Sequence, residues 1–225
     1  MPTDTALLMF AKYPEPGKVK TRLAASVGAG LAAQLYQEFI RSTFALAQQV
    51  EVAARFVTFA PADKEQDFRK LFPESGFWFA QADSADLGVR LHRAIQHVQA
   101  CGYAKVITIG TDSPSLPAAY LSQAMAALST HDLVLGPATD GGYYLIGVKS
   151  APRELFTGIA WSTEKVLEQS QLRAEELGMS VHQLPRWYDV DDLAALRRFC
   201  AEDHLSPALR QKVQSFLYND AEKFQ

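Results

Sequence analysis

Short apolar segments alternate with segments of helical periodicity along the chain, and this alternation constrains the fold most strongly. Strands alternating with helices form a mostly parallel sheet with helices on both faces, so the sequence predicts an α/β fold, a three-layer α/β/α sandwich. A strand pair around Gly141-Gly142 adds an antiparallel strand. The segments predicted as strands are rich in Val, Ile, Leu and Phe, as strands buried on both faces are: 6–11, 53–59, 77–80, 105–110, 132–136, 143–148 and 181–184.

Apolar residues at spacings of three, four and seven predict the helices between these strands. Such patterns cover 31–46, 87–98 and 166–177, the last opened by Ser162-Thr163 and closed by Gly178. A final helix is predicted over about 207–218, followed by a polar tail. The segment Gly28-Ala-Gly-Leu-Ala-Ala33 matches a dinucleotide-binding fingerprint but follows no strand, so we interpret it as the start of a helix.

Length and composition indicate one domain over residues 1–225, with 48% apolar residues for its core. A net charge of −3 gives no overall attraction to nucleic acid or to an anionic membrane. Cys101 and Cys200 lie in no metal-binding spacing and are expected to be core or half-buried thiols. The N-terminus lacks the pattern of a signal peptide or membrane span, so we expect a cytoplasmic protein. The sequence leaves the oligomeric state open.

Positive charge is concentrated in the loop after the first predicted strand. Pro14 and Pro16 stiffen this loop, and its glycine lets the backbone turn closely. Lys18, Lys20 and Arg22 place three cations within five residues. In a chain of net negative charge, this favours a polyphosphate-binding loop; a solvated basic loop is the alternative. The residues expected to bind phosphates are Lys12, Gly17, Lys18, Lys20, Thr21 and Arg22.

Acidic residues follow two later strands. Asp112 comes just after the strand 105–110, where a carboxylate can hold Mg²⁺ or Mn²⁺ against a diphosphate; capping of the following turn is the alternative. Asp189 and Asp191 follow the last strand and point the same way if extended, so one or both could complete the metal site. The alternative is N-capping of a helix by Asp191 or Asp192. Ligands lie at the carboxyl ends of the strands in such sheets.

A third polar segment follows the predicted strand 132–136. Asp140 precedes Gly141 and Gly142, which would let the backbone approach a ligand, although Asp-Gly is also an ordinary hairpin turn. The following Tyr143 favours the wall of a pocket for the acceptor or sugar. Trp161 could stack on a sugar or base, with a place in the core as the alternative.

Six segments, in the same order along residues 10–196, carry a family resemblance: FAKYPEPGKVKTRL, LGVRL, IGTDSPSLP, GPATDGGYYLIG, AWSTEKV and YDVDDLAAL. With them the chain resembles the bacterial glycosyltransferase-like family, formerly a domain of unknown function, of the nucleotide-diphospho-sugar transferase superfamily with the GT-A-type fold. The resemblance implies a nucleotide over the first loop, a metal at Asp112 and a second acidic ligand at Asp189 or Asp191. It also implies that Gly88 and Arg90 shape the nucleotide or donor pocket.

The chain departs from the superfamily patterns in ways that bear on the donor. Glycosyltransferases of this fold usually carry Asp-x-Asp where this chain has Thr111-Asp112-Ser113. The KTRL loop is closer to nucleotidyltransferases such as the 2-phospholactate guanylyltransferases. The usual Asp-Thr-Pro-Glu-Asp-Leu ending is also altered, with Asp192-Leu193-Ala194 in place of Thr-Pro-Glu.

The leading hypothesis is a metal-dependent glycosyltransferase that moves a sugar from an NDP-sugar to a small acceptor. Lys18, Lys20 and Arg22 would neutralise the charge that grows on the leaving phosphates, and Asp140 would orient or deprotonate the acceptor hydroxyl. A nucleotidyltransferase that moves NMP from an NTP to a phosphorylated small molecule is the alternative. A protein that binds a nucleotide without turnover is a third possibility.

Overall fold

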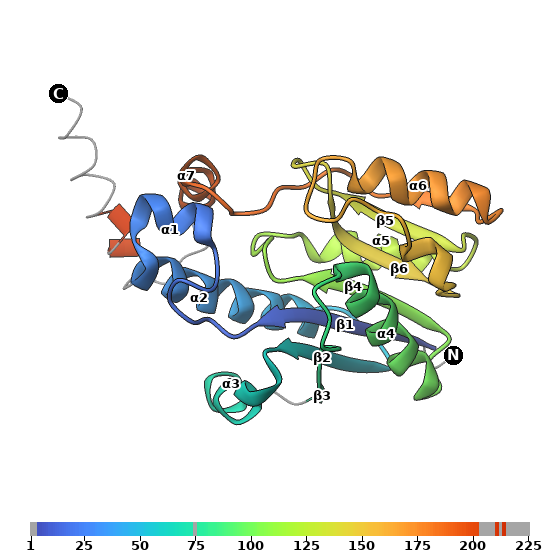
Figure 1. Ribbon diagram of the computed structural model, residues 1–225, viewed down its shortest axis with the longest axis horizontal. Coiled ribbons are helices and arrows are strands. Elements are labelled where there is room, and N and C mark those ends of the chain that lie inside the picture. Colours follow the sequence, from blue (N-terminus) through green and yellow to red (C-terminus); the bar gives the residue numbers. More distant parts are fainter. Residues whose placement is uncertain (1–3, 74–75, 203–209, 212, 215–225) are drawn as a thin grey trace.

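The computed structural model describes residues 4–73, 76–202, 210–211 and 213–214, and the strands of this part form one seven-stranded sheet (Figure 1). The strand order is β3-β2-β1-β4-β6-β5-β7. Strand β6 is antiparallel to both neighbours, and the other adjacent pairs are parallel, which confirms the mostly parallel α/β sheet. The strands are β1 (Thr5–Lys12), β2 (Ala54–Ala60), β3 (Phe77–Ala80), β4 (Lys105–Gly110), β5 (Leu133–Pro137), β6 (Tyr143–Val148) and β7 (Val181–Gln183).

Helices cover both faces of the sheet. The core on one face contains residues of α2 (Ala29–Gln48), α3 (Glu65–Leu71) and α5 (Ala118–Ala127), and α1 (Thr21–Val27) and α7 (Leu193–Ala201) pack against α2 on the same side. The other face packs against α4 (Leu87–Ala100), which lies in front of the strands in Figure 1, with α6 (Val166–Glu176) and the short helix η2 (Arg153–Phe156). A further short helix, η1 (Ala62–Lys64), precedes α3.

The two faces of β1 explain its continuous apolar sequence. Leu7 and Met9 belong to the core on the α2 side, whereas Ala6 and Leu8 belong to the core on the α4 side. Successive side chains of a strand point to opposite faces, so a strand covered on both faces is apolar at every position. Because such strands stand out as continuous apolar segments, the predicted strands agree with the observed ones to within about a residue at each end.

The predicted helices over 31–46, 87–98 and 166–177 correspond to α2, α4 and α6. The Gly28 segment is the start of α2, as interpreted, with Gly28 at φ 84° between α1 and α2. Most of the helix predicted over 207–218, and the polar tail, lie outside the described residues. Both cysteines are free, but Cys101 is exposed rather than packed, because it follows the last turn of α4. None of the described helices is long and apolar enough to cross a membrane.

The chain after β7 places its acidic residues beside β4. Segment 184–191 continues along the end of β5, where the Trp187 amide donates to the Pro137 carbonyl at 3.0 Å. It then reaches the loop after β4, where the Val190 amide donates to the Asp112 carbonyl at 2.9 Å. These backbone hydrogen bonds fix the acids of this segment at the carboxyl edge of the parallel strands.

Candidate active site

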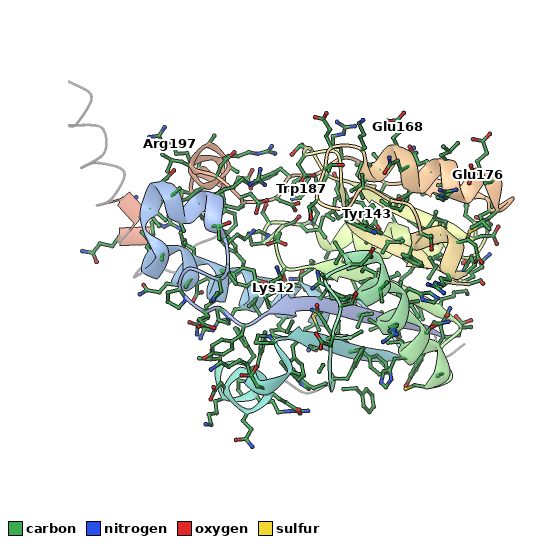
Figure 2. The ribbon with its side chains drawn as sticks, in the orientation of Figure 1. Lys12, Tyr143, Glu168, Glu176, Trp187 and Arg197 are labelled. Atoms are coloured by element: carbon green, nitrogen blue, oxygen red, sulfur yellow. The ribbon has the colours of Figure 1, made fainter. Side chains whose placement is uncertain are left out.

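A cavity of about 790 Å³ opens at the carboxyl edge of the parallel strands, within the size range of small-molecule sites. Lys12 and Tyr143 lie in the middle of the molecule in Figure 2, whereas Glu168 and Glu176 project from the outer side of α6. Gly17, Gly88 and Gly141 do not line the cavity. The other residues proposed from the sequence do: Lys12, Lys18, Lys20, Thr21, Arg22, Arg90, Asp112, Asp140, Gly142, Tyr143, Trp161, Asp189 and Asp191.

Lys20 lies at the centre of the charged part of this cavity. Its backbone adopts the left-handed conformation, at φ 48° and ψ 46°, which non-glycine residues seldom adopt. The side chain is only 3% exposed, and its ammonium forms ion pairs with Asp112 and, at 2.8 Å, with Asp191 Oδ1. Lys20 therefore joins the first loop, the end of β4 and the segment after β7.

Aromatic rings enclose the Lys20 ammonium on another side. The ring centroids of Tyr36 and Phe39, both on α2, lie 5.8 and 5.5 Å from Nζ. Burial alone would lower the pKa of Lys20, but Asp112 and Asp191 outweigh it and raise the pKa above its ordinary value. The ammonium therefore stays charged.

The three basic residues of the first loop differ in conformation and exposure. Lys18 is exposed, Lys20 is buried, and Arg22 lies in the first turn of α1 with 66% of its side chain exposed. The left-handed residue breaks the regular repeat, because it reverses the local twist of the backbone. All three side chains nevertheless line the same cavity.

Asp191 has a cation on each carboxylate oxygen. Oδ1 accepts from Lys20, and Oδ2 accepts from Arg22 Nη2 at 2.5 Å. Burial opposes ionisation of Asp191, but Lys20 and Arg22 outweigh it, so the pKa lies below its ordinary value. The helix cap is the neighbouring Asp192, whose Oδ1 accepts from the Ala195 amide at 2.8 Å. Of the two residues considered for the helix cap, Asp192 is therefore the cap, and Asp191 instead pairs with two cationic side chains.

Asp189 lies in a less compensated environment. The Ser113 hydroxyl donates to its Oδ1. Burial and the nearby Asp112 carboxylate raise the pKa of Asp189 to about 7, despite this hydrogen bond and the Lys20 charge. Two carboxylates close enough to repel each other are a site where an additional cation is stabilising.

The carboxylates fit a divalent cation only as a partial ligand set. Among the described residues, no group of three or more His, Cys, Asp or Glu side chains is arranged to hold a metal ion. Lys20 itself lies between Asp112 and Asp191. Asp112 and Asp189 remain as a pair, which matches the one or two carboxylates that Mg²⁺ takes when phosphates supply the other oxygens.

The Asp140 turn joins the site to α6. The Gly142 amide donates to Asp140 Oδ1 at 3.0 Å, so Asp140 shapes its own turn. Gly141 has φ 91°, and a Cβ there would lie 2.5 Å from Glu164 Cα. The space expected to admit a ligand at Gly141 is therefore filled by the backbone before α6. Gly142 does line the cavity.

The other wall of the cavity comes from α4 and from Trp161. A Cβ on Gly88 would lie 2.5 Å from the Phe156 carbonyl oxygen and 2.6 Å from Trp161 Nε1, so this glycine allows α4 to pack closely. Arg90 Nη1 donates to Gln81 Oε1 at 3.0 Å, and burial lowers the Arg90 pKa. Tyr143 packs edge-on to Trp161, with centroids 6.3 Å apart.

Two polar residues of the site were missed from the sequence. The Tyr36 hydroxyl accepts from the Lys12 amide at 3.1 Å and contacts Thr111 Oγ1 at 2.8 Å. Burial raises the Tyr36 pKa to about 12. Gln81 Nε2 donates to the Ala11 carbonyl at 3.0 Å. The sequence offered two indications of these residues: a tyrosine within the apolar face of α2, and a glutamine directly after β3.

The fold and this cavity define a class, the nucleotide-diphospho-sugar transferase-like proteins. The chain is similar to the crystal structure described as "putative nucleotide-diphospho-sugar transferase from Desulfovibrio desulfuricans G20", at 32% identity and TM-score 0.86, covering 97% of this chain and 96% of that one. Rv0371c from Mycobacterium tuberculosis H37Rv in complex with manganese shares the fold, at 16% identity, TM-score 0.54 and coverage of 87% and 97%. A CMP:2-keto-3-deoxy-manno-octonic acid synthetase complexed with CTP also shares the fold, at 15% identity and TM-score 0.55, covering 87% of this chain and 96% of that one.

Residues 43–163 match the family described as "uncharacterized protein conserved in bacteria (DUF2064)", and the chain belongs to this family. This match and the similarity over the whole chain confirm the family resemblance. No protein with a curated description matches the sequence.

Proposed function

We propose that this protein is a metal-dependent glycosyltransferase that moves a sugar from an NDP-sugar to a small acceptor. The shape and charge of the cavity support the proposal most directly. The cavity runs from the basic loop at Lys18 past the acids at Asp112 to the aromatic wall at Tyr143 and Trp161. Such a cavity has room for a diphosphate and, beyond it, for a sugar ring.

Asp112 and Asp189 are the proposed ligands of Mg²⁺ or Mn²⁺. Asp191 is less suited, because both of its oxygens already accept from cationic side chains. Burial, together with the nearby Asp112 carboxylate, raises the pKa of Asp189, and a cation between the two carboxylates would relieve both effects. When bound, this cation would offset the negative charge of the diphosphate.

The protein's own residues would stabilise the leaving group and activate the acceptor. Lys20 is held in place by two carboxylates and the rings below it, so its charge needs no reorganisation when the leaving diphosphate gains charge. Arg22 is anchored to Asp191 and extends into the same cavity. Asp140, which lines the same cavity and interacts electrostatically with Arg22, would orient or deprotonate the acceptor hydroxyl.

Thermal-shift measurements with nucleotides and NDP-sugars, with and without Mn²⁺, identify the donor. Product assays then distinguish the two transferase reactions: glycosyl transfer releases NDP from an NDP-sugar, and nucleotidyl transfer releases pyrophosphate from an NTP. We expect NDP release, and we expect Asp112→Asn to remove metal-dependent nucleotide binding while the fold stays intact. Asp63→Asn, at an exposed position in η1, is the matched control.

The lone Asp112 in place of Asp-x-Asp is the observation that favours nucleotidyl transfer. Pyrophosphate release that depends on a phosphorylated acceptor and is lost in Asp112→Asn would replace glycosyl transfer by that reaction. Unchanged metal-dependent affinity in Asp112→Asn, measured by calorimetry, would contradict the metal assignment. Tight nucleotide binding with no product under any acceptor would indicate a binding protein.

A further inference from the structure

A second cavity, of about 450 Å³, adjoins the first beneath α7. The two cavities share Arg22, Asp140, Asp189 and Asp191 as lining residues. We call the second one the α7 cavity. Its remaining wall is formed by Thr139, Tyr188, Asp192, Ala194, Ala195 and Arg198.

The shared residues are those at which the proposed reaction takes place. The other residues of the basic loop, among them Lys12, Lys18 and Lys20, line only the larger cavity, which is therefore the place for the diphosphate. An acceptor has to reach the sugar from a side that the diphosphate does not occupy. The α7 cavity meets the larger one at Asp140, the proposed base, and so offers that approach.

The cations of the α7 cavity are already compensated by carboxylates. Arg22 pairs with Asp191 at 2.5 Å. Arg198 Nε lies 3.1 Å from Glu202 Oε1, and its guanidinium lies 3.7 Å from the centroid of the Tyr188 ring. Arg198 is therefore balanced by Glu202, and Arg22 is assigned to the diphosphate of the larger cavity, so neither is available to an anionic acceptor.

The carboxylates that remain are Asp140 and Asp192, because Asp189 is a proposed metal ligand and Asp191 is paired with Arg22. A phosphorylated acceptor would place further negative charge beside them, with the two arginines already paired. Hydroxyl groups, in contrast, donate hydrogen bonds to carboxylates. We infer that the α7 cavity is the acceptor site and that the acceptor is an uncharged polyhydroxylated compound, a sugar or a polyol. This inference rests on the proposed glycosyl transfer.

The reaction that follows is balanced. An acceptor oxygen forms a bond to the anomeric carbon of the donor sugar, while the bond between that carbon and the diphosphate oxygen breaks. The electron pair of the broken bond leaves with the NDP. The hydroxyl proton passes to Asp140 and from there to water.

Ala194 allows a test of the site without disturbing the donor cavity. It is exposed, lies on α7 and lines only the α7 cavity, so Ala194→Leu fills acceptor space. Ala201→Leu makes the same change at an exposed position of the same helix that lines neither cavity. The probes are two matched pairs: glucose with glucose 6-phosphate, and glycerol with glycerol 3-phosphate.

Saturation-transfer NMR in the presence of NDP measures probe binding independently of turnover, and calorimetry measures the affinity for NDP. We expect signals from the uncharged probes at least tenfold stronger than from the phosphorylated ones. Ala194→Leu should lose most of this signal and keep the NDP affinity, and Ala201→Leu should change neither. A preference for the phosphorylated probes, or a signal unaffected by Ala194→Leu, would overturn the inference. Failure to bind NDP in the wild type would instead count against the proposed function.

Discussion

The buried ammonium of Lys20 provides the sharpest test of the charge arrangement in the site. Lys20→Met keeps most of the side-chain volume and removes the charge. Asp112 and Asp191 then lose the cation that both bind. The negative charges of Asp112, Asp189 and Asp191 still repel one another. The folded protein is destabilised, because these carboxylates stay close together while the unfolded chain separates them.

The size of the effect follows from burial. Removing one partner of a buried ion pair costs about 3–5 kcal/mol. The Asp112 and Asp191 side chains are 49% and 30% exposed, so water recovers part of this cost, and we expect a loss of about 2–3 kcal/mol at neutral pH. For a domain of this size, that lowers Tm by about 4–12 °C.

Thermal unfolding between pH 5 and pH 8 provides the measurement. Crowded carboxylates without Lys20 bind protons more readily in the folded state than in the unfolded chain, so the stability of Lys20→Met falls as pH rises. The difference in Tm from the wild type should therefore grow from pH 5 to pH 8. Lys18→Met, on the exposed part of the same loop, is the control. An equal loss in both variants, or a loss independent of pH, would refute the reasoning.

Asp189→Asn should raise Tm by a few °C at pH 8 and leave it nearly unchanged at pH 4. A folded pKa of about 7, above the ordinary value of 3.8, means that ionisation of Asp189 reduces stability as pH rises between these values. Arg22→Ala should weaken nucleoside diphosphate binding about ten- to a hundredfold in calorimetry, as expected for a lost charge-assisted contact, and leave nucleoside binding unchanged; equal losses would mean that the loop is structural. Gly141→Ala should cost about 3 kcal/mol or more in denaturant unfolding, because its Cβ overlaps the backbone of Glu164. Gly102→Ala, at a similar φ of 97° with open space around it, should cost only about 1 kcal/mol, and similar losses in both would rule out the packing explanation.

The positions of the strands, and of the helices α2, α4 and α6, along the chain could be predicted from the sequence because local chemistry decides them. Strands buried on both faces must be apolar throughout, and helices with one buried side must repeat about every 3.6 residues. The sequence also placed the candidate site at the edge of the sheet where the larger cavity lies. Asp112 and Asp140 directly follow strands, and parallel strands end at one edge.

Tertiary structure alone decided how these residues combine. Lys20 and Asp191 are 171 positions apart, and their contact depends on the left-handed turn at Lys20 and on the backbone hydrogen bond from Val190 to Asp112. Local sequence periodicity cannot predict a contact between residues so far apart in the chain. It arises only when the segment after β7 is fixed along the sheet edge.

The same reason explains the glycines and the helix cap. The doubled glycine after Asp140 suits a ligand pocket and close packing equally well in sequence, and only the position of the Glu164 backbone shows that Gly141 serves packing. Asp191 and Asp192 are adjacent and chemically identical. Because α7 begins at Leu193, Asp192 lies at the N-cap position. Asp191 lies instead against the basic loop from the other end of the chain, where it pairs with Lys20 and Arg22.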